Sequence, residues 1–247
     1  MTITDPRRRI ELQKLLKKLG LTDLSQVNWT LLDTALTHSS FSHENNYEQL
    51  EFVGDAVVRL VAAELLKETY PTLPVGEYAA IRSVIVSDRF LAEIAELYGI
   101  ETYLLIAPNV RGDRMGRISR LADAFEAILG ALYESTKTME LIRYWLDPVL
   151  SEKAAQVHAD PARQNYKDAL QEWTQRVHKS LPTYVVQEHR LNKGGENERF
   201  LAQVWLKDQL LGEGKGATKK ASHQAAAKQA FYTFVNQEQV SPVDKQR

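Results

Sequence analysis

The chain has 247 residues, of which 44% are hydrophobic and 26% are charged, so it can form one large domain or two medium domains with real cores. It contains no cysteine, which excludes a disulfide framework, thiolate metal sites and cysteine-ligated zinc fingers. Its formal net charge is −1. No apolar run approaches membrane-spanning length, and residues 1–20 lack the apolar core of a signal peptide. We therefore expect a cytoplasmic protein with no membrane partner.

Apolar residues recur at three- and four-residue spacings almost throughout residues 7–150, which predicts an all-α domain. The expected helices cover residues 6–19, 29–37, 46–69, 75–85, 87–98, 119–137 and 139–155. We assign residues 1–155 to this first domain.

Residues 48–56 begin the third expected helix with three acids among apolar residues. Glu48, Glu51 and Asp55 stand at i, i+3 and i+7, which places them on one face of a helix. Unpaired carboxylates against a core are costly, so a cation is expected there. Gly54, which costs about 1 kcal/mol in a helix interior, indicates that another backbone approaches closely.

Residues 121–130 repeat the pattern with two acids inside a hydrophobic helix. Packed together, the two helices would supply four carboxylates: Glu51, Asp55, Asp123 and Glu126. Mg²⁺ and Mn²⁺ prefer carboxylate and water oxygens. Such an ion polarises a phosphoryl oxygen and activates a bound water, which favours phosphodiester hydrolysis. The alternative, a solvated acidic helix face, is disfavoured by the apolar flanks of both motifs.

Residues 107–117 separate these helices and contain Pro108, with no apolar period, which predicts a loop. Its Arg111, Arg114 and Arg117 fit phosphate contacts and an ordinary solvated loop equally well.

The pattern changes class after a polar, proline-containing stretch, residues 156–164, which we interpret as a linker. We expect a helix at 166–177, antiparallel strands at 183–189, 199–206 and 209–216 with a turn at 192–195, and a helix at 219–235. This order describes a small α+β domain over residues 165–237, followed by a tail, 238–247. Residues 161–247 carry a net charge of +5 against −6 for residues 1–160, which favours a polyanion-binding module over ordinary variation in surface charge.

The acidic run at residues 48–56, residues 121–130 downstream and Leu36-Thr37-His38-Ser39-Ser40 upstream together resemble the signature of ribonuclease III, the double-strand-specific endoribonuclease. Residues 165–235 resemble the double-stranded-RNA-binding domain that follows the nuclease domain in the bacterial enzymes. By this resemblance the four carboxylates are the ligands of Mg²⁺, for which Mn²⁺ substitutes, and no small-molecule cofactor is needed. Asp55 and Glu126 are implied to be catalytic, with Glu48 a further acid in the catalytic valley.

The resemblance also implies a homodimer whose two active sites face one another across a valley that holds the duplex. Phe52 matches the aromatic residue that inserts into the partner, although burial preferences alone would make it a core residue of its own chain. Three positions of the nuclease domain depart from the family pattern. Val75 stands where an acid is usual, Tyr47 where Asn is common and Arg120 where an apolar residue is usual, and we expect neither Tyr47 nor Arg120 to touch a ligand.

Duplex RNA is recognised largely by shape, through its minor grooves and phosphates. The contact residues implied by the resemblance are Gln171, Glu172, Asn197, Lys219, Lys220 and His223. The first two would meet ribose hydroxyls, and the lysines at a helix start would meet phosphates. Glu196 stands where His is usual, which leaves Asn197 for that loop contact.

The residues and the resemblance together predict an Mg²⁺-dependent endoribonuclease that cuts both strands of double-stranded RNA. The resemblance further implies a role in rRNA and mRNA processing and products with 5′-phosphate and 3′-hydroxyl ends. The alternative is a non-catalytic double-stranded-RNA-binding protein on the same fold. The four carboxylates disfavour it, because a binding module has no reason to hold buried acids together. A DNA-directed nuclease is disfavoured by the C-terminal module, and His38, His43 and His158 are expected to be structural or exposed.

Overall fold

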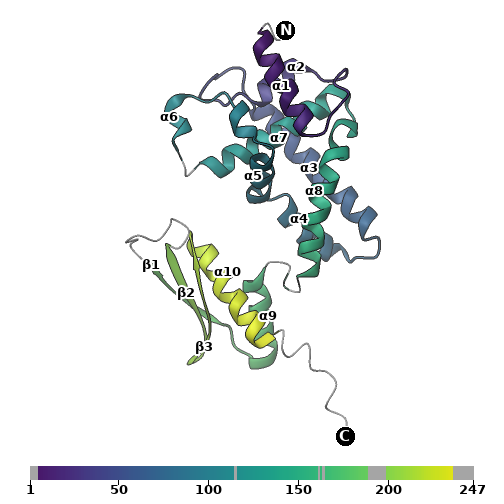
Figure 1. Ribbon diagram of the computed structural model, residues 1–247. Helices are drawn as coiled ribbons and strands as arrows, with labels where there is room; N and C mark the ends of the chain where they lie inside the picture. Colours follow the sequence, from purple (N-terminus) through teal and green to yellow (C-terminus); the bar gives the residue numbers. More distant parts are fainter. Residues whose placement is uncertain (1–4, 114–115, 161, 163–164, 189–198, 236–247) are drawn as a thin grey trace. The chain divides into compact units, whose positions relative to one another are not determined.

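The computed structural model describes residues 5–113, 116–160, 162, 165–188 and 199–235. The chain divides into two compact units, residues 1–159 and 160–247. The first is helical and the second combines helices with a sheet (Figure 1), which confirms the predicted fold class. Within the described residues, none of the helices is both long and apolar enough to cross a bilayer.

The helices of the N-terminal unit are α1 (Pro6–Lys18), α2 (Trp29–Ala35), α3 (Glu48–Thr69), α4 (Val75–Ile85), α5 (Asp88–Leu97), η1 (Ile100–Tyr103), α6 (Pro108–Arg111), α7 (Arg117–Thr136) and α8 (Glu140–Ala159). Short polar side chains start several of them by accepting hydrogen bonds from free backbone N–H groups. Asp5 caps α1, Asn28 caps α2 and Ser87 caps α5 in this way.

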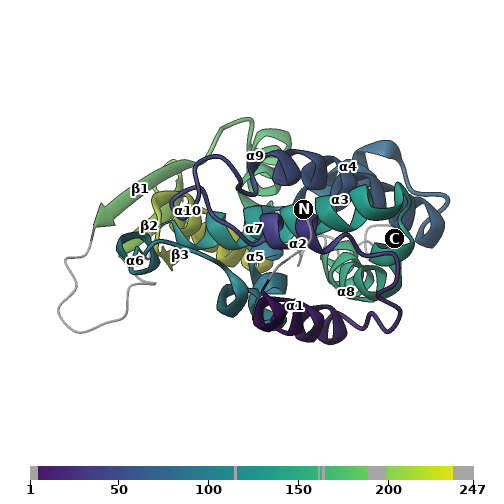
Figure 2. The ribbon, with the colours of Figure 1, turned by 90° about the horizontal axis from the view of Figure 1, so that it is seen from above.

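Helix α7 is the centre of this unit, and it packs along α3 and against α2, α5 and α8. Figure 2 shows α3 and α7 together in the middle of the unit. Two glycines allow the close contact, because a Cβ at Gly54 would overlap the carbonyl of Glu126 and one at Gly130 would overlap the carbonyl of Leu50. The close backbone approach predicted from Gly54 is therefore confirmed.

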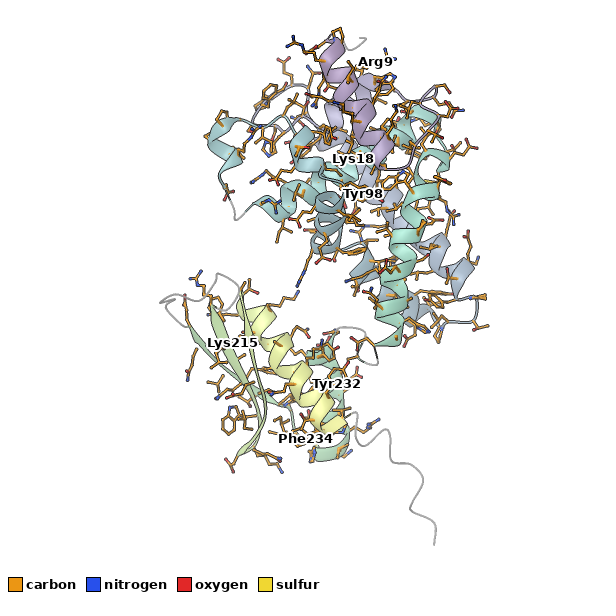
Figure 3. All side chains as sticks on the ribbon, viewed as in Figure 1. Arg9, Lys18, Tyr98, Lys215, Tyr232 and Phe234 are labelled. Carbon is orange, nitrogen blue, oxygen red and sulfur yellow. The ribbon has the colours of Figure 1, made fainter. Side chains whose placement is uncertain are left out.

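Cationic side chains of helix α1 contact the rest of the N-terminal unit. Figure 3 labels two of them, Arg9 and Lys18. Arg9 lies 5.0 Å from the ring centroid of Trp29, and Lys18 lies 5.3 Å from that of Tyr103. The buried Arg8 donates to the backbone carbonyl of Tyr103 at 2.8 Å.

The unit differs from the expectation at several places. The short helix α6 lies inside the segment expected to be a loop, and α8 ends at Ala159 rather than at residue 155. The extra turn is stabilised by Val157, which is fully buried. The linker and tail boundaries stay predictions, because residues 161, 163–164 and 236–247 lie outside the described part of the chain.

The C-terminal unit contains α9 (Tyr166–His178), β1 (Thr183–Glu188), β2 (Phe200–Leu206), β3 (Gln209–Gly216), α10 (Lys219–Ala230) and a closing π-helical turn, η3 (Phe231–Val235). The strands form an antiparallel sheet in the order β1-β2-β3, and the helices cover one face of it (Figure 1). The inward side chains of β2 alternate with less buried ones, as a half-buried strand requires. The expected turn at 192–195 lies outside the described residues.

Helix α10 lies directly on β3, which places its first turn at the end of that strand. A Cβ at Gly214 would overlap the backbone of Ala225 and Ala226, so glycine permits this approach. Thr218 caps the helix by accepting from the N–H of Ala221 at 3.1 Å. At the other end Tyr232 follows the helix, away from Lys215 on β3 (Figure 3).

Candidate active site

The start of α3 is held by the segment before it. The N–H of His38 donates to the carbonyl of Leu105, and the N–H of Tyr47 donates to the carbonyl of Thr37, both at 3.0 Å. The side chain of Asn46 then accepts from the N–H of Glu48 at 3.0 Å. The upstream motif therefore fixes where the first acidic helix begins.

Three carboxylates from two helices converge where α3 meets α7. Glu51 on α3 and Asp123 and Glu126 on α7 each offer an oxygen within 4.8 Å of the other two. We call these three residues the carboxylate triad. Among the residues that the structure describes, none of the lysines, arginines or histidines forms an ion pair with the triad.

Burial and mutual repulsion make ionisation of the triad costly. Burial raises the pKa of Glu126 to about 8, and the charges of Asp55 and Glu51 add to the rise. Burial raises the pKa of Glu51 to about 7, with Asp123 as the next cause. The pKa of Asp123 is also raised by burial. A divalent cation would relieve this repulsion, and hard oxygen donors are the ligands that Mg²⁺ and Mn²⁺ prefer, so these residues fit such an ion.

Asp55, the fourth predicted ligand, is engaged elsewhere. The Nε of Arg59 donates to both its carboxylate oxygens, at 2.7 and 2.9 Å. The charge of Asp55 still reaches the triad, since it contributes to the raised pKa of Glu126. Glu48 is exposed in the first turn of α3 and lies outside the triad, although its charge also raises the pKa of Glu51.

The sequence interpretation assigned no role at the site to two residues beside the triad. Burial raises the pKa of Asp123 and the phenol of the buried Tyr47 opposes that rise, so Tyr47 lies next to a predicted ligand, contrary to the expectation. Its ring meets His38 edge-on, with centroids 5.5 Å apart, which gives His38 a structural role. Tyr47 stands one turn before Glu51, and this helical spacing was the available clue.

Asp88 was also missed. It is the first residue of α5, and its charge contributes to the raised pKa of Glu51, Asp123 and Glu126. Its place depends on how α5 packs against α7, and no local pattern reveals that. Arg120, in contrast, is buried and donates to the carbonyl of Asp113 at 2.6 Å, away from the ligands as expected.

Phe52 points outward from α3 and is 82% exposed, which excludes a place in the core of its own chain. Val75 is the first residue of α4 and is 81% exposed.

Arg117 pairs with Glu96 and with Glu101, the latter at 2.6 Å, whereas Arg114 lies outside the described residues. This pairing favours a structural role for Arg117.

The expected RNA contacts of the C-terminal unit lie on two helices. Gln171 and Glu172 are exposed on α9, and Lys219 and Lys220 are exposed in the first turn of α10. His223 is half-buried, with its ring 4.8 Å from that of Tyr184, and burial lowers its pKa. Asn197 and Glu196 lie outside the described residues.

Comparison with known proteins identifies the family of each unit. A Ribonuclease-III-like family model matches residues 28–147, and a double-stranded RNA binding motif matches residues 166–232. Ribonuclease 3 2 of a Nostoc species is 56% identical, over 98% of this chain and 99% of its own. Ribonuclease 3 2 of a Synechocystis species is 51% identical over 97% and 98%, and Ribonuclease 3 of Gloeobacter violaceus is 44% identical over 92% of each chain. The chain therefore belongs to the ribonuclease III family of endoribonucleases, with a double-stranded-RNA-binding domain behind its nuclease domain.

Proposed function

We propose that this protein is a Mg²⁺-dependent endoribonuclease that hydrolyses both strands of double-stranded RNA and leaves 5′-phosphate and 3′-hydroxyl ends. The carboxylate triad is the observation that carries the proposal, because three converging acids with raised pKa values and no basic partner in the described chain form a site for a divalent cation. Mn²⁺, with the same preference for oxygen donors, would substitute.

The triad and Asp55 would hold the metal, which would supply a nucleophilic water and stabilise charge on the phosphoryl group and the leaving oxygen. The protein orients these ligands through its own contacts. Tyr47 lies next to Asp123 and would orient it, and the glycine contact of α3 with α7 sets the separation of Glu51 from Glu126. Glu48, one turn before Glu51 on α3, is proposed to act in the catalytic valley.

The C-terminal unit would supply duplex affinity. Lys219 and Lys220 extend from the positively polarised first turn of α10 and are proposed to bind phosphates. Gln171 and Glu172 are proposed to meet ribose hydroxyls, which distinguish RNA from DNA. His223 and Asn197 complete the proposed contact set.

We also propose a homodimer that acts in the cytoplasm on rRNA and mRNA precursors. The support for the dimer is Phe52, because a phenylalanine that is 82% exposed on the helix carrying two of the site acids is costly to leave in water. Insertion of this ring into a partner chain would bury it and bring two sites together.

The test is incubation of the purified protein with long duplex RNA, single-stranded RNA and duplex DNA, each with Mg²⁺ and with chelator. Duplex RNA alone should be cut, and only with metal. Glu126→Gln should abolish cleavage while duplex binding persists. Glu134→Gln is the matched control, since Glu134 lies on the same helix and pairs with Lys137 at the surface. Cleavage by Glu126→Gln would refute the site, and absence of cleavage by the unmodified protein would favour the non-catalytic RNA-binding alternative.

A further inference from the structure

Arg59 is a cation within the acidic site that the family signature, residues 48–56, does not include. It follows Asp55 by one turn on α3, as Asp55 follows Glu51, so the three side chains line one face of that helix. Its guanidinium contacts the carboxylate of Asp55 through two nitrogen atoms. The Nε lies 2.7 and 2.9 Å from the two carboxylate oxygens, and Nη2 lies 2.7 Å from one of them.

Arg59 lies among acidic residues that would also surround the proposed metal ion. Acids from three helices favour its charged form, namely Asp55 on α3, Glu126 on α7 and Asp88 on α5. Two of these acids, Asp55 and Asp88, also add to the rise that burial causes in the pKa of Glu51 and of Glu126. Arg59 therefore neutralises the one predicted ligand that stands outside the triad.

We propose that Arg59 is a positioning residue that holds Asp55 away from the triad in the metal-free enzyme, so that Arg59 and a divalent metal ion compete for the same carboxylate. Binding of the ion then transfers Asp55 from the guanidinium to the metal. The inference rests on the proposed metal-dependent function and adds a built-in competitor to it. Its consequence is a metal affinity below the one that the four carboxylates alone would give.

An ordinary surface ion pair is the competing explanation. Arg89 and Glu93 form such a pair at the same i,i+4 spacing on α5, at 3.2 Å. Arg89 follows Asp88 directly, so Arg89→Gln removes one positive charge from the neighbourhood of the site without touching a predicted ligand. It is therefore the matched control for charge alone.

The experiment is calorimetric titration of Mn²⁺ into the metal-free full chain without RNA, for the unmodified protein, Arg59→Gln, Arg59→Lys and Arg89→Gln. Arg59→Gln should bind Mn²⁺ about three- to fivefold more tightly, the range expected when a partly exposed ion pair stops competing. Arg59→Lys should fall between, because an ammonium keeps the charge but lacks the planar fork. Arg89→Gln should bind as the unmodified protein does.

A second measurement separates positioning from structure. The Mg²⁺ concentration that gives half-maximal cleavage of duplex RNA should fall by the same factor in Arg59→Gln, while the rate at saturating Mg²⁺ stays unchanged. Equal or weaker Mn²⁺ affinity in Arg59→Gln, or an equal gain in Arg89→Gln, would overturn the inference. Failure of the proposed function looks different, because Glu126→Gln would then bind Mn²⁺ as well as the unmodified protein.

Discussion

Glu126→Gln should stabilise the metal-free protein, and more so as the pH rises. Glu126 is 9% exposed, and its pKa is raised from 4.5 to about 8 by burial and by neighbouring acids. The folded state therefore keeps a proton that the unfolded chain releases. Stability from this proton is fully present below about pH 4.5 and is lost as the pH rises through about 8.

Linkage sets the size of the effect. One extra bound proton lowers the free energy of unfolding by up to about 1.4 kcal/mol for each pH unit inside the window. Because the neighbouring Glu51 and Asp55 are only half-buried, we take about half of the full value, which is about 2 kcal/mol between about pH 5 and pH 8. Glutamine has nearly the same size as glutamate and never ionises. The variant should therefore melt about 6 °C higher than the unmodified protein near pH 8, with little difference near pH 5.

Scanning calorimetry of the full chain in chelator, at both pH values, measures this difference. Glu134→Gln, with its surface pair on the same helix, should show no comparable pH-dependent gain. Adding Mn²⁺ near pH 8 should raise the melting temperature of the unmodified protein, since a ligand that binds only the folded state stabilises it. The increase should be much smaller for Glu126→Gln, which lacks one of the proposed metal ligands. A melting difference that is the same at both pH values would refute the reasoning.

Gly54→Ala should lower the free energy of unfolding by at least about 3 kcal/mol, because its Cβ would overlap the backbone of α7, and urea unfolding measures the loss. Tyr47→Phe should weaken Mn²⁺ binding severalfold in a calorimetric titration, and unchanged affinity would mean that the Tyr47 hydroxyl does not orient Asp123. Phe52→Glu should convert a dimer to a monomer in sedimentation experiments, and a persistent dimer would show that the interface lies elsewhere. Lys219→Ala combined with Lys220→Ala should reduce the slope of log affinity against log salt by about two units, whereas an unchanged slope would exclude phosphate contacts.

The sequence predicted the features that depend on local spacing. The apolar period of α3 and α7 indicated both helices, and the acids at helical spacing indicated one face of each. Gly54 indicated a close backbone contact, because glycine inside a helix carries a cost that packing must offset.

The remaining features depend on contacts between distant segments or on a choice of rotamer. Asp88 and Tyr47 reach the triad only because α5 and the segment before α3 pack beside α7. Asp55 could extend toward the triad or toward Arg59, and spacing is the same in both cases. The last turn of α8 was missed because its polar residues are typical of a linker, while Val157 alone packs into the core.

The contact between α3 and α7 links the stability of this protein to its chemistry. Gly54 and Gly130 let the two backbones approach, and this approach is what brings Glu51 within reach of Glu126. Burial at this contact, together with the acids that it gathers, raises the pKa of both carboxyl groups and so costs stability whenever they ionise without a cation. A wider separation would stabilise the metal-free chain but would spread the ligands beyond the reach of one small ion. Within this pair of helices, the cost in the free energy of folding and the affinity for a divalent metal therefore have a single physical origin.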